Sequence, residues 1–406
     1  MQTYDVIPLG MIDGRPAIPT AVNDAGEVVG TAGTVGQSER AFFWKRGRIV
    51  PLLGPNPDEP TVANDINSVG YVVGRAANQA VIWAGPGPAI EVAPGELVAI
   101  NDVGGVIGYR EVSRFRPTAF YLSRQQRPFA IKPPLSIDTF VTALNNRGTV
   151  VGNFQCDVQF ETGAFVWSAG AFEAVRFCRE PFEFRHADIN DAGQYVAWNG
   201  RNRTGYLIEP DGDASILGPG NEPLGLNNLG EVVGAYPVDN GNKTHGFHWL
   251  DGEFTDLNNL ILPGSWVITS AIDINDLGVI VSTGQSNSDG VPQGLVLVPN
   301  AISYRVGIGD LPIVAGRPAE FLLAGATPGA DQYPFLSVKG KGETRLRFLD
   351  VTLGLRQPSL LGVVEAGDDG RVRIIVPLPR SMRGEDALIQ VAEFRGVTNI
   401  VEISIR

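Results

Sequence analysis

Three aspartates occupy the same place in a motif that recurs along the chain, two residues before a repeated asparagine: Asp65, Asp188 and Asp273. Carboxylates brought together can act as acid and base on a sugar or an ester, or can bind a cation. The same side chains can instead accept hydrogen bonds from backbone N–H groups of their own turn or of a neighbouring unit. The sequence favours the structural role. If the protein is an enzyme, the three aspartates are the candidate catalytic residues.

Two cysteines, Cys156 and Cys178, are candidates for a disulfide. Each follows a predicted strand of the same sheet, and the alternation of strand direction places both at one end of it, roughly 10 Å apart. Adjustment of the loops can bring the two Cα atoms within the range of about 4.4–6.8 Å that a bridge requires. We expect a disulfide, which would indicate an oxidising compartment. Two unpaired thiols are the alternative.

The three histidines, His186, His245 and His248, do not form a recognisable metal site. His245 and His248 are three residues apart on a predicted strand, so they point to opposite faces of it. No zinc-protease, nucleophile-elbow, Walker or dinucleotide-binding motif is present. We therefore expect no metal and no cofactor. Calcium is the alternative, because the loops at 209–215 and 285–290 carry oxygen ligands, although without the spacing of a known calcium loop.

The motif itself, aliphatic-Asn-x-x-Gly, occurs seven times, with 34 to 48 residues between successive asparagines. We number the repeats one to seven by these asparagines, in chain order: Asn23, Asn67, Asn101, Asn145, Asn190, Asn227 and Asn275. An Asn side chain bonds its own backbone readily, and the Gly is free to take a positive φ. We therefore expect each asparagine to have a structural role in a tight turn.

Each repeat contains about four short strands and no segment with the period of a helix. The motif leads into a strand such as YVVG before Arg75, and a second strand of small and aromatic residues follows, as in AFVW ending at Trp167. Units of this length with four strands, repeated four to eight times, are typical of β-propeller blades. The sequence predicts an all-β protein with a seven-bladed β-propeller over residues 1–300.

The two ends of the repeat array complement each other. Repeat seven supplies three strands and lacks its fourth, whereas the segment before Met11 resembles a fourth strand with no repeat in front of it. Pairing the two would close the ring and remove exposed sheet edges. We therefore expect the N-terminal strand to complete the seventh blade.

Residues 301–406 differ from the repeats in pattern and in charge. They contain no copy of the motif and alternate strand patterns with turns, which predicts an antiparallel β-sandwich module of immunoglobulin-like type. Residues 1–300 carry 19 Lys and Arg against 32 Asp and Glu, a net charge of −13, whereas residues 301–406 carry 13 against 12, a net charge of +1. The acidity belongs to the repeat array.

Composition excludes several classes of protein. With 50 Gly and 29 Pro in 406 residues, helical bundles and coiled coils are excluded. The acidic repeats and the lack of a basic run indicate that the chain does not bind nucleic acid. No apolar stretch approaches the length that spans a bilayer, so we expect no membrane insertion. The first residues show no signal peptide, and the N-terminal Met is compatible with a mature exported chain.

The repeats resemble those of the bacterial HAF-repeat proteins, which are often described as probable extracellular repeats. The resemblance covers residues 3–299 and is carried by HADINDAG ending at Gly193, AIDINDLG ending at Gly278, THGFHW ending at Trp249 and FTDLNNL ending at Leu260. Only His245 keeps the histidine of the family name, and repeat five has QYVAW where VVG is usual. The resemblance implies an exported β-propeller, extracellular or periplasmic, with no assigned catalytic activity.

Two functions remain in view. The first is a non-enzymatic binding or structural protein that presents propeller loops to a glycan or a protein partner. The loops at 113–117, 154–162 and 236–244 vary most between the repeats and would share one face. The alternative is a propeller hydrolase or lyase that uses the carboxylates of Asp65, Asp188 and Asp273. Convergence of these carboxylates in one pocket would favour the enzyme, and separate burial against backbone donors would favour the binding protein.

Overall fold

The computed structural model contains strands, turns and three short 3-10 helices among the residues that it describes. The description covers residues 3–405 except for 35–36, 112–116, 124–127, 135, 157–161, 177–183, 288–289, 300–304, 309–314, 316–317, 325, 327–330, 348, 350, 366–371, 394–395 and 399–400. No α-helix lies within these described residues, which confirms the all-β prediction. Nor does any described segment form a helix of the length and apolarity needed to cross a membrane.

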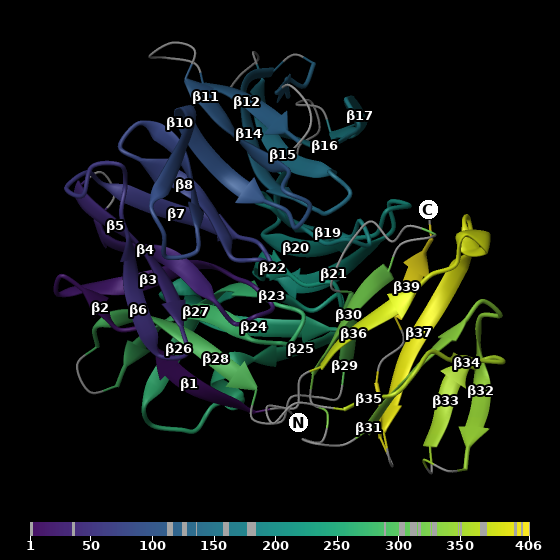
Figure 1. The fold of residues 1–406 in the computed structure, drawn as a ribbon. Helices are drawn as coiled ribbons and strands as arrows, with labels where there is room; N and C mark the ends of the chain where they lie inside the picture. The colour runs from purple at the N-terminus through teal and green to yellow at the C-terminus, as the bar shows by residue number, and fades with distance from the viewer. Residues whose placement is uncertain are drawn as a thin grey trace. The chain divides into compact units, whose positions relative to one another are not determined.

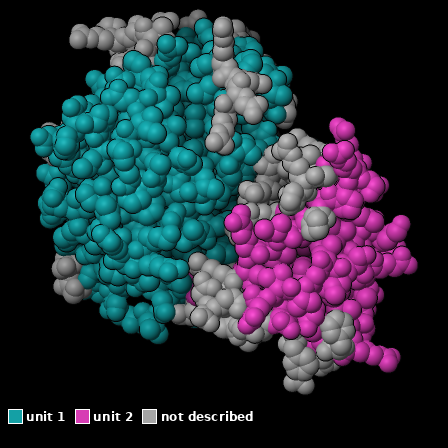
Figure 2. All heavy atoms as spheres, in the orientation of Figure 1, with its two compact units in different colours: residues 1, 3–298 teal, residues 2, 299–406 magenta. Residues whose placement is uncertain are grey.

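The chain divides into two compact units, the first ending at Val298 and the second beginning at Pro299 (Figure 2). Each unit has its own buried apolar clusters. Those of the first unit join neighbouring repeats, and those of the second join its sheets. The repeat motifs all lie in the first unit.

Each repeat of the first unit forms an antiparallel sheet of four strands (Figure 1). Repeat one has β3 (Arg15–Val22), β4 (Val28–Thr34), β5 (Gln37–Lys45) and β6 (Arg48–Leu52), with β2 (Met11–Ile12) added beside β3. Repeats two and three share the long strand β10, so that one sheet holds β7 (Thr61–Ile66), β8 (Tyr71–Ala76), β9 (Gln79–Ala84), β10 (Ala89–Ile100), β11 (Val106–Glu111), β12 (Pro117–Leu122) and β13 (Phe129–Ala130).

The remaining repeats follow the same order from first to fourth strand. Repeat four has β14 (Ser136–Leu144), β15 (Val150–Cys156), β16 (Thr162–Ser168) and β17 (Ala171–Arg176). Repeat five has β18 (Phe184–Ile189), β19 (Tyr195–Asn199), β20 (Thr204–Ile208) and β21 (Ala214–Pro219). Repeat six has β22 (Glu222–Leu226), β23 (Val232–Val238), β24 (Lys243–Leu250) and β25 (Glu253–Asp256).

Repeat seven takes its fourth strand from the start of the chain. Its sheet runs β26 (Trp266–Ile274), β27 (Ile280–Ser286), β28 (Pro292–Pro299) and then β1 (Tyr4–Pro8), which lies beside β28 in Figure 1. The N–H of Leu9 donates to the carbonyl of Gly294 at 2.9 Å, and the N–H of Tyr4 donates to the carbonyl of Leu260 at 2.8 Å. The two ends of the repeat array are therefore joined by hydrogen bonds.

Every repeat has a β-bulge between its first and second strands. The register shifts at the same distance before each motif asparagine, between Pro19/Ala21, Ala63/Asp65, Leu97/Ala99, Val141/Ala143, His186/Asp188, Pro223/Gly225 and Ala271/Asp273. A bulge re-aims the residues beside it. The position of the three candidate aspartates is therefore set by a backbone irregularity that all seven repeats share.

The bulge also explains the glycine that ends the second-strand motif. A Cβ at Gly74 would lie 2.0 Å from the carbonyl oxygen of Val62, and a Cβ at Gly234 would lie 2.0 Å from that of Glu222. The bulged strand turns this carbonyl toward the glycine, so no side chain fits there without a shift. Repeats five and seven have Ala197 and Ser282 at this position, which shows that a displacement is tolerated there.

Packing between repeats accounts for the tryptophans near the ends of third strands, such as Trp83 in β9 and Trp167 in β16. Trp83 of repeat two packs against Val29 and Phe43 of repeat one. Trp167 of repeat four lies in a cluster with Ile107 of repeat three. Each ring is buried in a contact with the preceding repeat, because a large apolar surface gains most where two sheets face each other. These tryptophans are thus packing residues rather than a ligand platform.

The described residues of the second unit form two sheets and a hairpin. One sheet contains β29 (Arg305–Ile308), β30 (Pro318–Ala324) and β36 (Val372–Pro377). The other contains β31 (Asp331–Ser337), β34 (Ser359–Leu360), β35 (Val364–Glu365), β37 (Asp386–Glu393), β38 (Gly396–Val397) and β39 (Val401–Ser404). The hairpin is β32 (Lys341–Leu346) with β33 (Val351–Leu355).

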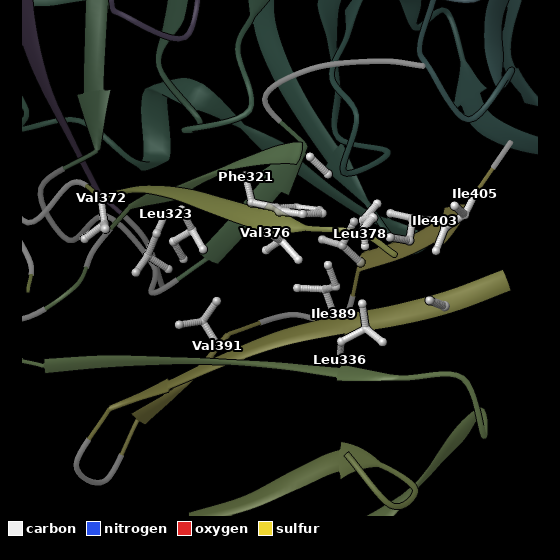
Figure 3. Close-up of a cluster of buried hydrophobic side chains, with 14 of the residues drawn as sticks. Phe321, Leu323, Leu336, Val372, Val376, Leu378, Ile389, Val391, Ile403 and Ile405 are labelled. Atoms are coloured by element: carbon white, nitrogen blue, oxygen red, sulfur yellow. The ribbon is translucent and has the colours of Figure 1, made fainter. Parts of the chain in front are cut away.

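The sheet around β37 is covered on both faces. Phe321 and Val376 of the first sheet meet Ile389 and Val391 of β37 in one buried cluster (Figure 3). A second cluster joins Leu388 of β37 to side chains of the β32–β33 hairpin. Successive residues of β37 point to opposite faces of the sheet and each face has a partner, which is why the strand is buried at every residue after Asp386.

The predicted disulfide falls partly outside the described residues. The backbone of Cys156 ends β15, but its side chain and the whole of Cys178 lie beyond the description. The part of the chain that the structure describes contains no disulfide. The pairing of Cys156 with Cys178 stays a prediction.

The role of the bulge-facing glycine can be tested with Gly74→Ala. We expect the free energy of unfolding to fall by about 1–3 kcal/mol, because the new Cβ forces the bulged backbone to move. The matched control is Ala197→Gly, which removes a Cβ from the same position in repeat five and should cost less than about 1 kcal/mol. Urea unfolding followed by tryptophan fluorescence measures both. Equal losses in the two variants would contradict the explanation.

Candidate axial cavity

The ends of the seven first strands enclose a cavity of about 190 Å³. It is lined by residues from just before each motif asparagine to just after it, and six of these are aspartates: Asp24, Asp65, Asp102, Asp188, Asp191 and Asp276. No Lys, Arg or His occurs among these described lining residues. The cavity is therefore acidic, and it is the candidate site of the repeat array.

The motif asparagines form a closed ring of hydrogen bonds around this cavity. Each side-chain amide donates to the backbone carbonyl of the asparagine in the next repeat, over distances of 2.8–3.2 Å, and Asn275 of repeat seven donates to Asn23 of repeat one. Each side-chain oxygen accepts an N–H from its own turn, as Asn67 does from Tyr71 at 2.9 Å. The asparagines are buried, so both functions of the amide are needed and no other residue type supplies them at this length.

Asp65, Asp188 and Asp273 each bridge two neighbouring repeats. Asp65 accepts the N–H of Ile66 in its own repeat and that of Ile100 in repeat three, at 2.7 and 2.8 Å. Asp188 accepts from Ile189 and Leu226 in the same way, and Asp273 accepts from Ile274 and, across the closure of the chain, from Val22. Both oxygens of each carboxylate thus hold a backbone N–H.

These bonds account for the number of aspartates found two residues before the motif asparagines. Seven first strands present one such N–H each, directly before the asparagine, and a carboxylate holds two of them. Three carboxylates therefore serve six repeats, and the N–H of Leu144 in repeat four is the one that none of the three accepts. The other four repeats have small residues at this position: Ala21, Ala99, Ala143 and Gly225.

The surroundings raise the pKa of these three carboxyl groups. Burial is the main cause for each, and it raises the pKa of Asp65, Asp188 and Asp273 from 3.8 to about 7. The two N–H donors lower the pKa, and the charges of the other aspartates raise it further. Asp65 and Asp188 line the cavity and all three residues are partly exposed, but the strands around the carboxyl groups leave little water to stabilise a charge.

The residues directly after the seven asparagines form a second set of polar side chains around the cavity. In six of the repeats the N–H of this residue donates to the side-chain oxygen of its counterpart in the next repeat, as from Ser68 to Asp102 at 2.7 Å and from Asp102 to Asn146 at 2.7 Å. The members in chain order are Asp24, Ser68, Asp102, Asn146, Asp191, Asn228 and Asp276. Sequence reasoning treated this position only as part of a turn, although the recurrence of Asp and Asn in six of the seven repeats was a signal.

Amides separate most carboxylates of this second set. The amide of Asn146 donates to both Asp102 and Asp191, at 3.0 Å each, and that of Asn228 donates to Asp276 at 3.0 Å. Asp24 and Asp276 are instead direct neighbours, with the N–H of Asp276 3.0 Å from an oxygen of Asp24. Burial first and then the charge of Asp24 raise the pKa of Asp276 well above its usual value, and burial raises the pKa of Asp191.

His245 and His248 do not line the cavity. His245 Nδ1 lies 2.8 Å from Asp256 Oδ2, and the hydroxyl of Tyr236 donates to the same oxygen at 2.7 Å. Burial raises the pKa of Asp256, but hydrogen bonds from His245, Asn258 and Tyr236 outweigh it and hold the pKa below its usual value. The side chain of His186 lies outside the described residues. Among the residues described, no cluster of three or more potential metal ligands occurs.

The two loops considered for calcium have other contacts or incomplete descriptions. In the loop at 209–215, Glu209 accepts a hydrogen bond from Gln194 at 2.8 Å, and Asp211 accepts the N–H of Asp213 at 3.1 Å. In the loop at 285–290, Ser288 and Asp289 lie outside the description. Neither loop gathers oxygen ligands in the described part of the chain.

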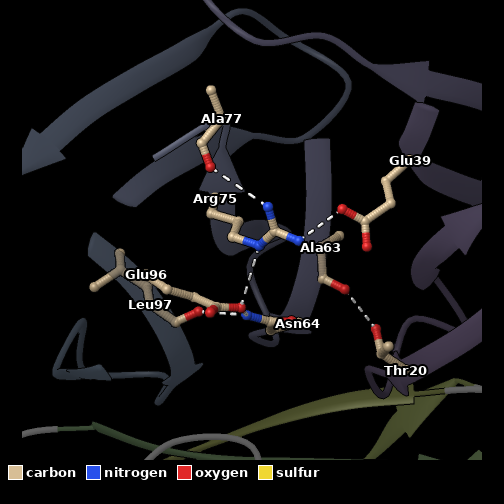
Figure 4. A network of polar contacts seen from close by, with 8 residues as sticks. All are labelled: Thr20, Glu39, Ala63, Asn64, Arg75, Ala77, Glu96 and Leu97. Atoms are coloured by element: carbon tan, nitrogen blue, oxygen red, sulfur yellow. Dashed lines mark hydrogen bonds and ion pairs between the residues drawn. The ribbon is translucent and has the colours of Figure 1, made fainter. Parts of the chain in front are cut away.

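A polar network joins repeats one, two and three away from the cavity (Figure 4). Arg75 donates to Glu39 at 2.6 Å and lies 3.9 Å from Glu96. Asn64 donates to Glu96 at 2.8 Å and to the carbonyl of Leu97 at 2.7 Å. The acids here are matched by a cation and an amide, so this network stabilises the contacts between repeats.

Comparisons with known proteins show similarity of structure only. No family model matches the chain, and no curated protein matches it. Among solved structures, a virginiamycin B lyase from Staphylococcus aureus is 12% identical over 73% of this chain and 100% of that chain, with a TM-score of 0.47. YCF48 bound to D1 peptide is 12% identical over 73% and 96%, with a TM-score of 0.47. The β-propeller domain of Cps50 (Swd1) from Myceliophteria thermophila is 8% identical over 72% and 98%, with a TM-score of 0.44.

The raised carboxyl pKa values predict that stability falls as the pH rises. The folded protein keeps protons that the unfolded chain has released, so the contribution is present in full below about pH 4 and is lost as the pH rises through about 7. Asp65→Ala copies the residue of repeats one, three and four and removes one titrating group. We expect a shallower fall of the unfolding midpoint with pH in this variant than in the wild type. Parallel pH profiles would contradict the assignment.

The neighbouring acids of the second set give a second prediction. Asp24→Asn keeps the oxygen that accepts the N–H of Asp276 and adds an amide donor facing its carboxylate, as Asn146 does for Asp102. We expect the free energy of unfolding near pH 8 to rise by roughly 1 kcal/mol, and the gain to shrink as the pH falls and Asp276 takes up a proton. The control Asp102→Asn places an amide beside the amide of Asn146 and should give no gain in chemical denaturation. Destabilisation by Asp24→Asn would contradict the reasoning.

Proposed function

We propose that the first unit is a seven-bladed β-propeller closed by β1 and that the second is an immunoglobulin-like sandwich module. Two observations support this architecture. Each repeat contributes four strands, with β10 shared by repeats two and three, and the ring of hydrogen bonds returns from Asn275 to Asn23. We also propose membership of the HAF-repeat family and an extracellular or periplasmic location. The bond between His245 and Asp256, which occupy the family's H and D positions, gives both motif residues a shared role.

We propose that the protein is a non-enzymatic binding protein whose axial cavity receives a cationic side chain of a protein partner. The observation that carries this proposal is the lining of the cavity, with six aspartates and no basic residue among those described. A Lys or Arg side chain would supply the missing counter-charge. An uncharged glycan would not.

Exposed apolar residues beside the cavity favour a protein as the partner. Val69 and Val103 lie in the turns directly after the lining residues, and their side chains are 68% and 38% exposed. Exposed apolar residues around a charged centre are typical of protein interfaces. Of the variable loops, 236–244 is described and consists of the ends of β23 and β24 with a short 3-10 turn at Asp239–Gly241. Residues 112–116 and 157–161 lie outside the description, so the role proposed for those two loops rests on the sequence alone.

The alternative of a hydrolase or lyase has one observation in its favour. Asp65 and Asp188 line the same cavity, and the pKa of each is raised to about 7, which suits a general acid. Against it, both oxygens of each carboxylate hold a backbone N–H, so a proton on either oxygen would weaken a bond between repeats. We therefore place the binding function first.

The binding function predicts selectivity for basic peptides. A fluorescently labelled oligolysine peptide should bind the full chain, with affinity that falls as salt is added, and an oligoglutamate peptide should not. Asp24→Asn should weaken oligolysine binding several-fold, because it removes one of the carboxylates that line the cavity. The control is Asp251→Asn, which removes an exposed charge that does not line the cavity and should bind as the wild type does. Equal binding by both variants would place the peptide elsewhere on the acidic surface and refute the proposal.

A further inference from the structure

The hairpin that β32 and β33 form in the second unit (Figure 1) carries an excess of positive charge. Residues 338–357, which include both strands, hold five Lys and Arg against two Asp and Glu, a net charge of +3. Of the two acids, Glu343 is exposed and Asp350 lies outside the description. All five cations are exposed: Lys339, Lys341, Arg345, Arg347 and Arg356.

One face of this hairpin is apolar and packed, which leaves its charged residues on the other face. Leu353 and Leu355 of β33 are fully buried in the cluster that joins the hairpin to β37. Along β32, exposed and half-buried residues alternate, so Lys341, Glu343 and Arg345 point to the same side. The cations therefore face outward because the leucines face inward.

Most of these cations have no partner of opposite charge. Within the described residues, four of the five form no ion pair: Lys339, Lys341, Arg347 and Arg356. Arg345 donates to the hydroxyl of Thr352 on the neighbouring strand at 3.3 Å. The outer face of the hairpin therefore keeps positive charge that a surface of opposite sign can bind.

The first unit has a surface of that sign. Residues 1–300 carry a net charge of −13, and the axial cavity is lined by six aspartates with no basic residue among those described. Its volume of about 190 Å³ is that of several water molecules, so it admits the end of a long side chain but no strand or loop. The chain thus carries both halves of one charged contact, on two separate compact units.

We infer that the partner of the axial cavity is a second copy of this chain, which inserts a Lys or Arg side chain from the outer face of its β32–β33 hairpin. The inference rests on the function proposed above, because it names the protein that supplies the cationic side chain. The hairpin and the cavity are different surfaces, so the contact is heterologous and each copy can engage two others. Copies joined in this way form rings or open chains rather than a two-fold dimer.

Sedimentation velocity of the full chain tests this self-association. We expect the wild type to associate at low salt, with an association constant that falls at least tenfold between about 0.02 M and about 0.5 M salt. Lys341→Gln combined with Arg347→Gln should lower the constant about tenfold at low salt, because it removes two cations from the docking face. Both side chains are exposed, so the variant should fold, which circular dichroism checks.

The matched control removes the same charge elsewhere in the second unit. Arg380→Gln combined with Arg383→Gln changes two exposed cations at the 3-10 turn Arg380–Met382, where the acids Glu385 and Asp386 follow. This variant should associate as the wild type does. Equal losses in the two double variants would overturn the inference, because net charge rather than the hairpin would then govern association.

Two further measurements address the cavity side of the contact. Asp24→Asn should weaken self-association several-fold, and an excess of oligolysine peptide should dissociate the assemblies, because both act at the receiving cavity. A wild type that binds oligolysine but stays monomeric at low salt would overturn the inference and leave the proposed function standing, with another protein as the partner. If oligolysine does not bind either, the proposed function fails and the inference fails with it.

Discussion

The ring of seven asparagine side chains is the interaction on which the first unit depends. Seven first strands end around one axis, and each leaves backbone groups there that neighbouring sheets do not satisfy. An Asn amide can accept from its own turn and donate to the next repeat at the same time, and every ring asparagine does both. Because the last bond joins Asn275 to Asn23, residues 252 positions apart in the chain, the ring also holds the two ends of the array together.

The acidic character of the axis follows from the same requirement. The N–H groups just before the asparagines need acceptors, and Asp65, Asp188 and Asp273 serve two repeats each. Structural demand thus concentrates carboxylates in one cavity and raises their pKa. The cavity proposed to receive a basic side chain is a consequence of how the repeats are joined, so any binding there is linked to the protonation and stability of the ring.

The sequence predicted the all-β class and the role of the repeats from particular residues. The Asn and Gly spacing identified the turns, and the strand before Met11 identified the partner of β28. The β-bulges were not predicted; the trace that we recognise afterwards is the glycine that faces the bulged carbonyl in five of the seven repeats, with Ala197 and Ser282 in the other two. The contact between Asp24 and Asp276 was also hidden, since the two lie 252 positions apart in the chain and only the fold brings them together.

The most direct test of this account is the free energy of unfolding of Asn275→Asp. This replacement keeps the oxygen that accepts the N–H groups of Leu277 and Val279 but removes the amide that donates to Asn23. The account predicts a loss of about 1–3 kcal/mol, because a buried carbonyl loses its donor, together with faster hydrogen exchange in β1, β28 and β3. Wild-type stability and unchanged exchange in those strands would contradict the claim that the asparagine ring holds the repeats together.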